Sequence, residues 1–434
     1  MTIRMKYRPI VQYSLIYFML IINQSQLYKM YIQQYNYFLV VLAACLLVFI
    51  RRSSKQYTTL FLLILLDSIL FVRIFVGGIG LSAWANWAIK ILAALLAVIY
   101  DRDKFIIRYI RTVVILAIIS IIGFSIQMIA PNILKSFLMC YNSSWHYNVW
   151  LSSNSYRTYS FKGYGLFLYT FIDNGNMRNI GIFTEPGVYQ MVLNSAILLL
   201  LFFCDKVSIS SKRRIQYFLI LMLTIILCQS TTGYIGFVGN ILVLYLLRQK
   251  NYKELRASVL SLVAAVVMFL VIDLIVRGNG SMIYSVVISK ISKSGSIDLN
   301  VSTGRYRLGT IYICIKTILE HPLGVGADGL QIILNTIQTG YVAASILTIG
   351  AMLGIIPFIF ILTWLFYPII VSHESISIKI LIVFLYFNTA LAQSSPFYPS
   401  LVIIPILFQT YRFNIMQMRR GGFRDDKFYN SLLQ

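Results

Sequence analysis

The chain has 434 residues, of which 59% are hydrophobic and 12% charged, and its mean hydropathy is +0.77. This apolar content is too high for a soluble core, so it excludes a soluble enzyme, a nucleic-acid-binding protein and a disordered chain. The formal net charge of +23 is therefore interpreted as a signal of membrane orientation.

Continuous apolar runs predict an all-α polytopic membrane protein with about twelve transmembrane helices, because a hydrocarbon layer roughly 30 Å thick takes about 20 helical residues per crossing. The whole chain, 1–434, is expected to form one integral membrane domain that ends in a basic tail at 412–434. The expected spans are 9–23, 35–50, 57–76, 81–100, 109–130, 187–204, 215–230, 233–247, 257–276, 342–369, 376–392 and 397–411.

The distribution of basic residues predicts which ends of the spans face the cytoplasm. Connections such as 51–55, 205–214 and 248–256 are rich in Lys and Arg, whereas the short connections on the opposite face contain only Lys29. The positive-inside rule then places both termini in the cytoplasm, with the first span retained as an anchor. The two long connections, 131–186 and 277–341, are expected on the outer face, where we predict the chemistry.

Two charged residues are expected inside the membrane. Asp67 and Lys90 each lie ten residues from the glycine-rich turn at 77–80, so an antiparallel pair of helices would place them at the same depth. We predict an ion pair between them. A structural role is favoured over a proton or ion relay.

No metal centre is predicted from the cysteine, histidine and acidic residues. The cysteines have no paired spacing, and although Cys140 and Cys314 could form a disulfide, this pairing is not favoured. Asp101 and Asp103 form an Asp-x-Asp motif among basic residues, and a solvated surface is favoured over a metal clamp for a nucleotide sugar.

The first outer loop is rich in Tyr, Trp and Phe between 141 and 169. These rings suit either the faces of sugars or an interfacial aromatic belt, and the sequence supports both interpretations equally. The loop ends in MRNIGIFTEPG at 177–187, in which Arg178 and Glu185 are candidate functional residues. Alternatively, Glu185 is only a helix cap, because Pro186 is well suited to the first turn of a helix.

The second outer loop contains STGRYRLGTIYICIKTILEHPLGVGADG at 302–329. Apolar residues recur at steps of three and four, which predicts an amphipathic helix that begins at Ser302 or Thr303 and ends at His321. Arg305 and Arg307 lie in its first turn, where the helix dipole disfavours cations, so we expect an anion there.

Glycines follow this helix at three positions, Gly324, Gly326 and Gly329, and we expect them to allow tight turns. By themselves, these glycines are weak evidence for a phosphate-binding loop. Together with Arg178, Arg305 and Arg307, and with Arg277 as a further candidate, they suggest a metal-free site that neutralises a phosphorylated leaving group.

The two stretches RNIGIFTEPG and STGRYRLGT…HPLGVG, each in an outer loop, resemble the O-antigen polymerase (Wzy-type) and O-antigen ligase superfamily. The resemblance implies a membrane glycosyltransferase fold of the GT-C type in the bacterial cytoplasmic (inner) membrane, active on its outer, periplasmic face without a metal or cofactor. It implies a glycan on undecaprenyl pyrophosphate as donor and a lipid-linked repeat unit as acceptor. A chain-length regulator protein is a candidate partner, and the product would be O-antigen, capsular or exopolysaccharide.

Carried over by position, the resemblance implies that Arg178 and Arg305 are the functional arginines, with Glu185 and the turn from His321 to Gly326 shaping the site. Glu185 is the favoured general base by motif; the alternatives are Asp328, Glu320 and Asp298.

Two other functions compete with the polymerase. Ligases of this superfamily usually carry a histidine before the following span, and the corresponding segment 337–345 has none, which favours a polymerase over a ligase. A lipid-linked oligosaccharide flippase or other transporter would favour internal repeats, which are not seen. The predicted pair of Asp67 and Lys90 is the one feature that a transporter explains better.

Overall fold

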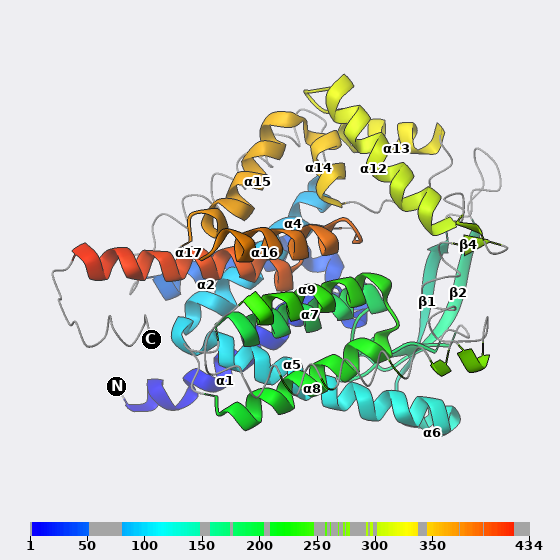
Figure 1. Cartoon of the computed structure of the whole chain (residues 1–434), viewed down its shortest axis with the longest axis horizontal. Coiled ribbons are helices and arrows are strands. Elements are labelled where there is room, and N and C mark those ends of the chain that lie inside the picture. Colours follow the sequence, from blue (N-terminus) through cyan, green and yellow to red (C-terminus); the bar gives the residue numbers. More distant parts are fainter. Residues whose placement is uncertain are drawn as a thin grey trace.

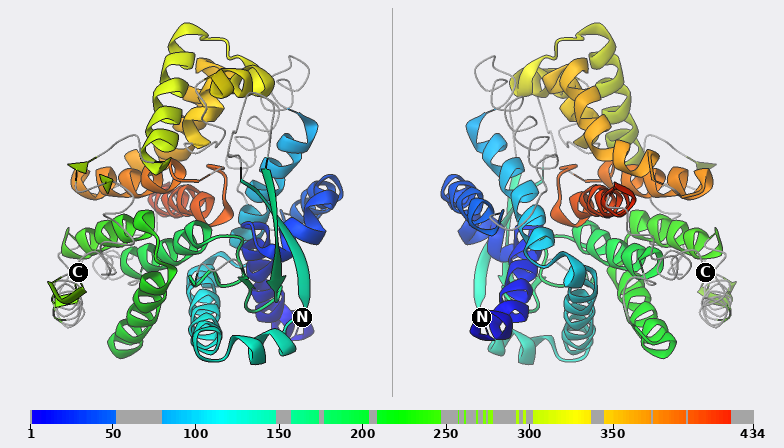
Figure 2. Two further views of the ribbon diagram at one scale, coloured as in Figure 1. Left: turned by 90° about the vertical axis from the view of Figure 1, so that its right-hand side faces the viewer. Right: turned by 90° about the vertical axis from the view of Figure 1, so that its left-hand side faces the viewer.

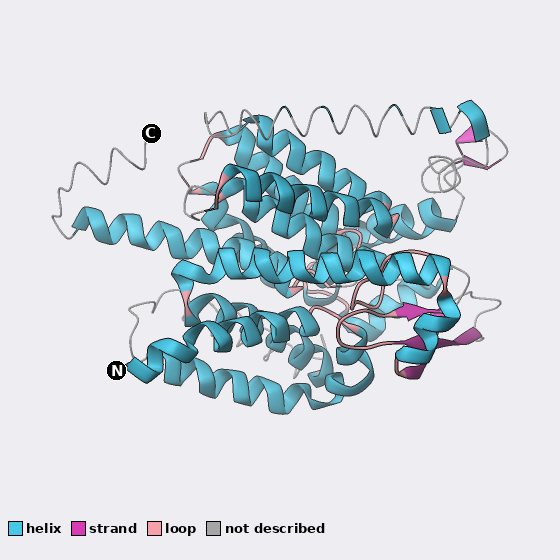
Figure 3. Cartoon of the chain, turned by 90° about the horizontal axis from the view of Figure 1, so that it is seen from below, coloured by secondary structure: helices cyan, strands magenta, loops and turns pink. Residues whose placement is uncertain are grey.

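The computed structural model of this protein describes the main elements of the chain and is predominantly helical (Figure 3). The described residues are 2–51, 80–147, 157–173, 177–203, 209–246, 257, 261, 268, 272, 273, 275–277, 292, 293, 296, 297, 302–336, 345–372, 374–393 and 395–420. The expected span at 57–76 and most of that at 257–276 lie outside them.

The described residues between 2 and 137 are almost entirely helical. They form α1 (Thr2–Ile22), the π-helix η1 (Tyr28–Ile32), the 3₁₀-helix η2 (Gln33–Tyr35), α2 (Asn36–Arg51), α4 (Leu81–Tyr100), α5 (Arg102–Ile129) and α6 (Pro131–Phe137). Helix α4 has the predicted bounds. Ala130 interrupts the helical backbone between α5 and α6, and Pro131 begins the new helix at a position where its missing N–H is not needed.

A small antiparallel sheet follows α6, in the order β1 (Cys140–Tyr147), β2 (Arg157–Tyr164) and β3 (Phe171–Ile172). Tyr141 pairs with Gly163, and Tyr164 pairs with Phe171. The first outer loop was expected only as a connection within an all-α protein, and this part of the prediction was wrong. Alternation of Ser and Thr with large rings favours extended backbone here, and the hairpin pairs its own N–H and C=O groups.

The remaining helices of the bundle are α7 (Pro186–Phe202), α8 (Ser211–Cys228), α9 (Thr231–Leu246), α16 (Ile376–Ala390) and α17 (Pro399–Arg420). They lie near the predicted spans. The expected single span at 342–369 is instead two helices, α14 (Ser345–Leu353) and α15 (Ile355–Ile370), because Gly354 adopts a left-handed backbone (φ +91°) that ends the first helix.

The described part of the segment 277–341, which was expected as the second outer loop, is also mainly helical. It contains the short strands β4 (Ser292–Lys293) and β5 (Ser296–Ile297), the predicted amphipathic helix α12 (Ser302–Glu320) and an unpredicted helix α13 (Gly326–Thr336). Helices α12, α13 and α14 project from one side of the bundle (Figures 1 and 2) and share a small apolar core that includes Ile313, Leu330 and Ala351.

Within the described ranges, three stretches are long and apolar enough to cross a membrane: Tyr28–Leu47, Leu81–Tyr100 and Arg102–Ile129. Shorter apolar helices, including Pro186–Phe202 and Ile355–Ile370, accompany them. The amino-terminal end of α1 and the carboxyl-terminal end of α17 lie at the same end of the bundle, and the β1–β2 hairpin lies at the other (Figure 1). The total of twelve crossings and the side of the membrane on which each terminus lies stay predictions.

Candidate functional site

The loop that carries Arg178 and Glu185 is held on several sides. The backbone N–H of Asn179 donates to the carbonyl oxygen of Leu227 (3.0 Å), and its side-chain amide donates to Ser120 Oγ (3.1 Å). The carbonyl oxygen of Gly181 accepts from the N–H of Thr170 (2.7 Å). These hydrogen bonds hold the loop at Asn179 and Gly181 against α8, α5 and the residue before β3.

Arg178 lies at the start of this loop and is partly buried. It is close enough to Tyr234, at the start of α9, to interact electrostatically with the phenol. Because Arg178 is only partly buried, it retains access to solvent. It is therefore available to an anionic group at the same end of the molecule as the sheet.

Glu185 lies directly before α7, and Pro186 occupies the first helical turn as the sequence predicted. Its side chain makes no capping hydrogen bond with the described residues of α7. Lys29 of η1 instead interacts electrostatically with this carboxylate. The helix start is confirmed, but capping through the side chain does not account for the acid at this position.

The turn between α1 and η1 lies alongside this loop. Gln26 N–H donates to the carbonyl oxygen of Ile182 (3.0 Å), and Thr184 N–H donates to that of Gln24 (3.1 Å). Ser25 and Phe183 form an antiparallel bridge between these two hydrogen bonds. Residues more than 150 positions apart thereby form a short two-stranded contact immediately before Glu185.

Four buried polar side chains in this region carry atoms without a hydrogen-bond partner among the described residues. These atoms are Asn23 Nδ2, Gln26 Oε1, Thr184 Oγ1 and Gln393 Oε1, and each residue is at most 3% exposed. We call these four residues the polar cluster. An unpartnered buried polar atom typically costs about 1–3 kcal/mol, so the cluster is unfavourable unless another molecule supplies partners.

Gln393 brings a third segment of the chain to this place. A Cβ atom at Gly187 would lie 2.5 Å from Gln393 Nε2, so the glutamine packs directly on the first turn of α7. The carbonyl oxygen of Gln393 accepts from the N–H of Ser345 (3.2 Å), the first residue of α14. The end of the second outer loop is therefore joined to the helix start that follows the first.

The turn after α12 is explained by packing. Gly324 and Gly326 have left-handed backbones (φ +83° and +74°), as expected, whereas Gly329 lies inside α13 and forms no such turn. A Cβ at Gly324 would lie 2.4 Å from the carbonyl oxygen of Met352. The turn is pinned to the α14–α15 junction by the hydrogen bond from Ile355 N–H to the carbonyl oxygen of Pro322 (2.8 Å).

The structure describes the side chain of Arg277 but not those of the two arginines in α12. Arg305 and Arg307 lie in the first turns of α12, as predicted, while their side chains lie outside the described part of the structure. Arg277 is 71% exposed and pairs with Asp273 of its own helix (3.3 Å). His321 ends α12 and is exposed. Among the described side chains, neither Arg277 nor His321 forms a hydrogen bond or ion pair with Arg178.

The alternative general bases differ from Glu185 in exposure. Asp328 is exposed in the first turn of α13. Glu320 is also exposed and pairs with Lys316 of α12 (3.7 Å). Asp298 lies outside the described residues. Among the described candidates Glu185 alone is partly buried, and it adjoins the polar cluster.

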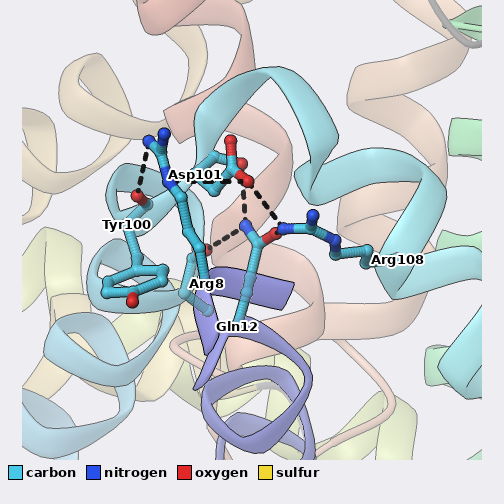
Figure 4. A network of polar contacts seen from close by, with 6 residues as sticks. Arg8, Gln12, Tyr100, Asp101 and Arg108 are labelled. Atoms are coloured by element: carbon cyan, nitrogen blue, oxygen red, sulfur yellow. Dashed lines mark hydrogen bonds and ion pairs between the residues drawn. The ribbon is translucent and has the colours of Figure 1, made fainter. Parts of the chain in front are cut away.

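Asp101 was expected on a solvated surface, and this prediction was wrong. Its carboxylate is largely buried and accepts from Arg108 (2.6 Å), with Arg8 at 3.8 Å (Figure 4). Gln12 donates to the carbonyl oxygen of Asp101 (2.7 Å) and accepts from Arg108. These hydrogen bonds and ion pairs hold α1, α4 and α5 together. Asp103, by contrast, is 83% exposed, as expected.

Other sequence predictions have mixed outcomes. Lys90 is buried as expected, and its Nζ lies 4.5 Å from the centre of the Tyr398 ring, a cation–π contact. Asp67, its predicted partner, lies outside the described residues. Cys140 and Cys314 are both free, and burial raises the pKa of the Cys314 thiol to about 12. No group of three metal-binding side chains occurs among the described residues.

Sequence reasoning missed the polar cluster. Segments 23–34 and 393–396 were interpreted only as short outer connections, although NQSQ at 23–26 is an unusually polar ending for an apolar helix. That polarity was the available signal. Its contact with 182–184 depends on tertiary structure, which no local pattern encodes.

Comparisons with protein-family models, with curated proteins and with solved structures find no match to this chain.

Proposed function

We propose that this protein is a metal-independent glycosyltransferase of the bacterial cytoplasmic membrane. In this proposal it is a polymerase that joins undecaprenyl-pyrophosphate-linked repeat units into surface polysaccharide on the outer face. The proposal rests on the motif resemblance and on one structural observation. The segments that carry the polar cluster meet the chain on either side of a partly buried carboxylate, Glu185, and Arg178 lies on the same loop.

The arrangement suits glycosyl transfer chemically. The hydroxyl oxygen of the acceptor sugar forms the new bond to the anomeric carbon of the donor, and the bond from that carbon to the pyrophosphate oxygen breaks. Glu185 takes the hydroxyl proton, and Arg178 neutralises the departing pyrophosphate, with Arg305 and Arg307 of α12 in the same role. Guanidinium groups suit this task because they bind phosphate oxygens in pairs.

The polar cluster has a natural role in this chemistry. Sugars present many neutral hydroxyl groups that both donate and accept hydrogen bonds. Asn23 Nδ2 offers a donor and Gln26 Oε1 an acceptor, and each lacks a partner within the described structure. We assign the polar cluster to holding the acceptor sugar beside Glu185, where its hydroxyl would be oriented for attack.

The test is the length of surface glycan, separated on a denaturing gel, from cells that lack this protein and are complemented with variants. We expect the native chain to restore a ladder and Glu185→Gln to leave single repeats. Asp103→Asn is the control, because its carboxylate is 83% exposed and has no role in the proposed mechanism. A normal ladder from Glu185→Gln would remove Glu185 from the mechanism.

The same gel separates the competing functions. If polymer forms in deleted cells but stays lipid-linked, the protein is a ligase. If even single repeats fail to reach the surface, it is a transporter. Either result would overturn the polymerase proposal.

A further inference from the structure

An apolar groove of about 400 Å³ lies beside the end of α5. Ile122 and Ile126 of α5 form one side and Phe137 of α6 another, while residues 165–169, between β2 and β3, form the third. This volume lies within the range of about 300–1,000 Å³ that is typical of small-molecule sites. The lining is almost wholly hydrocarbon, so a polar ligand would lose its hydration without gaining partners.

The groove is open to the apolar outside of the helix bundle. Ile122 is 55% exposed, Phe137 83% and Phe167 57%, although α5 is long and apolar enough to span a membrane. Exposed aliphatic side chains continue along α5 at Ile115 and Ile118. The groove is thus continuous with the surface that a bilayer would cover, and a hydrocarbon chain could enter it without crossing water.

The inner wall of the groove is built onto the loop that carries Arg178. The Tyr169 ring packs on Gly123 of α5, where a Cβ would lie 2.7 Å from it, and the Tyr169 hydroxyl donates to Gln127 (2.6 Å). The next residue, Thr170, donates its N–H to the carbonyl oxygen of Gly181 (2.7 Å).

A second connection runs through α5. Ile119 lines the groove, and Ser120 is hydrogen-bonded to the side chain of Asn179, the neighbour of Arg178. Next to Leu134, which lines the groove, Lys135 of α6 pairs with Asp173 (2.6 Å). The apolar groove is therefore joined, through α5 and through residues 169–170, to the loop that carries the Arg178 guanidinium, which suits a lipid with an anionic headgroup.

We propose that this groove holds the hydrocarbon chain of the lipid-linked pyrophosphate donor, with its headgroup directed towards Arg178. This inference rests on the proposed function and adds the route by which the donor reaches the site. Other bilayer lipids share the hydrocarbon chain, so the test must separate the polyprenyl chain from the acyl chains of phospholipids.

The test measures binding of undecaprenyl phosphate to the purified full-length protein in nanodiscs of phosphatidylcholine. Ile122→Trp narrows the groove, whereas Ile115→Trp is the matched control, because Ile115 is also 55% exposed, lies on the same helix and does not line the groove. We expect Ile122→Trp to weaken binding by about tenfold, equivalent to losing contact with about two methylene groups, and Ile115→Trp to leave it unchanged.

Leu168→Trp, at an exposed position of the opposite wall, repeats the test if Ile122→Trp does not fold. Equal affinity of the groove and control variants would overturn the proposal. So would displacement of undecaprenyl phosphate by phosphatidylglycerol at equal concentration, because the groove would then hold an ordinary bilayer lipid.

The experiments distinguish failure of the lipid-groove proposal from failure of the polymerase proposal. If Ile122→Trp binds the lipid normally and the glycan ladder still depends on Glu185, only the proposal that the groove binds the donor lipid is overturned. Loss of lipid binding in Ile122→Trp, with surface glycan unaffected by deletion of the protein, would support a lipid site and overturn the polymerase.

Discussion

The backbone N–H of Thr184 donates to the carbonyl oxygen of Gln24 at 3.1 Å, across 160 residues of sequence. This hydrogen bond places the residue before Glu185 against the turn that follows α1. It leaves the Thr184 hydroxyl buried and without a partner among the described residues. The backbone N–H of Thr184 is hydrogen-bonded here, whereas polar side-chain atoms of the surrounding polar cluster have no hydrogen-bond partner among the described residues.

The first prediction concerns the unpartnered side-chain oxygen of Gln26 in the polar cluster. We expect Gln26→Met to raise the free energy of unfolding by about 1 kcal/mol, because it removes a buried carbonyl oxygen that has no partner. We also expect shorter glycan, because stability and activity trade against each other at binding sites. Thermal unfolding in detergent and the glycan ladder measure the two effects.

Gln190→Met is the control for this experiment. Gln190 is fully buried, but its amide donates to the carbonyl oxygen of Gly187 (2.9 Å) and its oxygen accepts from Asn194 (2.9 Å). This substitution should lower stability by about 1–3 kcal/mol, because it leaves buried groups unpaired. Destabilisation of similar size by both variants would show that Gln26 has a structural role.

The second prediction concerns the junction between α14 and α15. We expect Gly354→Ala to destabilise the protein by at least about 1–2 kcal/mol, the cost of a left-handed backbone for a residue with a Cβ. The added Cβ would also lie 2.6 Å from the carbonyl carbon of Leu323. Gly80→Ala is the control, since its nearest contact would be Ser82 Oγ at 3.9 Å. Equal unfolding temperatures of Gly354→Ala and Gly80→Ala would contradict the close packing of Gly354 against Leu323.

The third prediction separates an ion pair from a metal site at the other end of the bundle. Asp101→Asn should destabilise the protein by about 1–3 kcal/mol, because it weakens a largely buried contact with Arg108. Asp103→Asn should have no measurable effect, since Asp103 is 83% exposed. Chelation with EDTA should leave polymer formation unchanged. Activity that Mg²⁺ restores after chelation would favour the metal clamp instead.

The fourth prediction concerns the first turn of α12. Arg305→Lys keeps the positive charge but loses the planar guanidinium, and we expect activity to fall by about 10²-fold, as for loss of one transition-state donor. Lys316→Gln, at an exposed position of the same helix, is the control. Normal glycan length from Arg305→Ala would exclude a role for this residue.

The local elements were predictable where one local property decides the structure. Helix α4 follows from an uninterrupted run of Ala, Leu and Ile, and α12 follows from apolar residues at helical spacing that end at His321. The start of α7 at Pro186 follows from the restricted backbone of proline.

The break at Gly354 was not predictable in this way. The run 342–369 is apolar throughout, so hydropathy alone predicts one helix. The left-handed glycine becomes necessary only because Pro322 and Leu323 pack against it from the second outer loop. Likewise, the acidity of Asp101 was visible in the sequence, but its burial depends on Arg8 and Arg108 approaching from α1 and α5.

Hydropathy and local spacing were enough to predict an apolar, mainly helical chain, the positions of most of its helices and the two motifs that contain Arg178 and Arg305. The contact of NQSQ at 23–26 and of Gln393 with the start of α7, beside Glu185, emerges only when the helices pack. This difference follows from the range of the interactions, because hydropathy and turn preferences act between residues near in sequence. Hydrogen bonds between distant segments depend on how the helices pack.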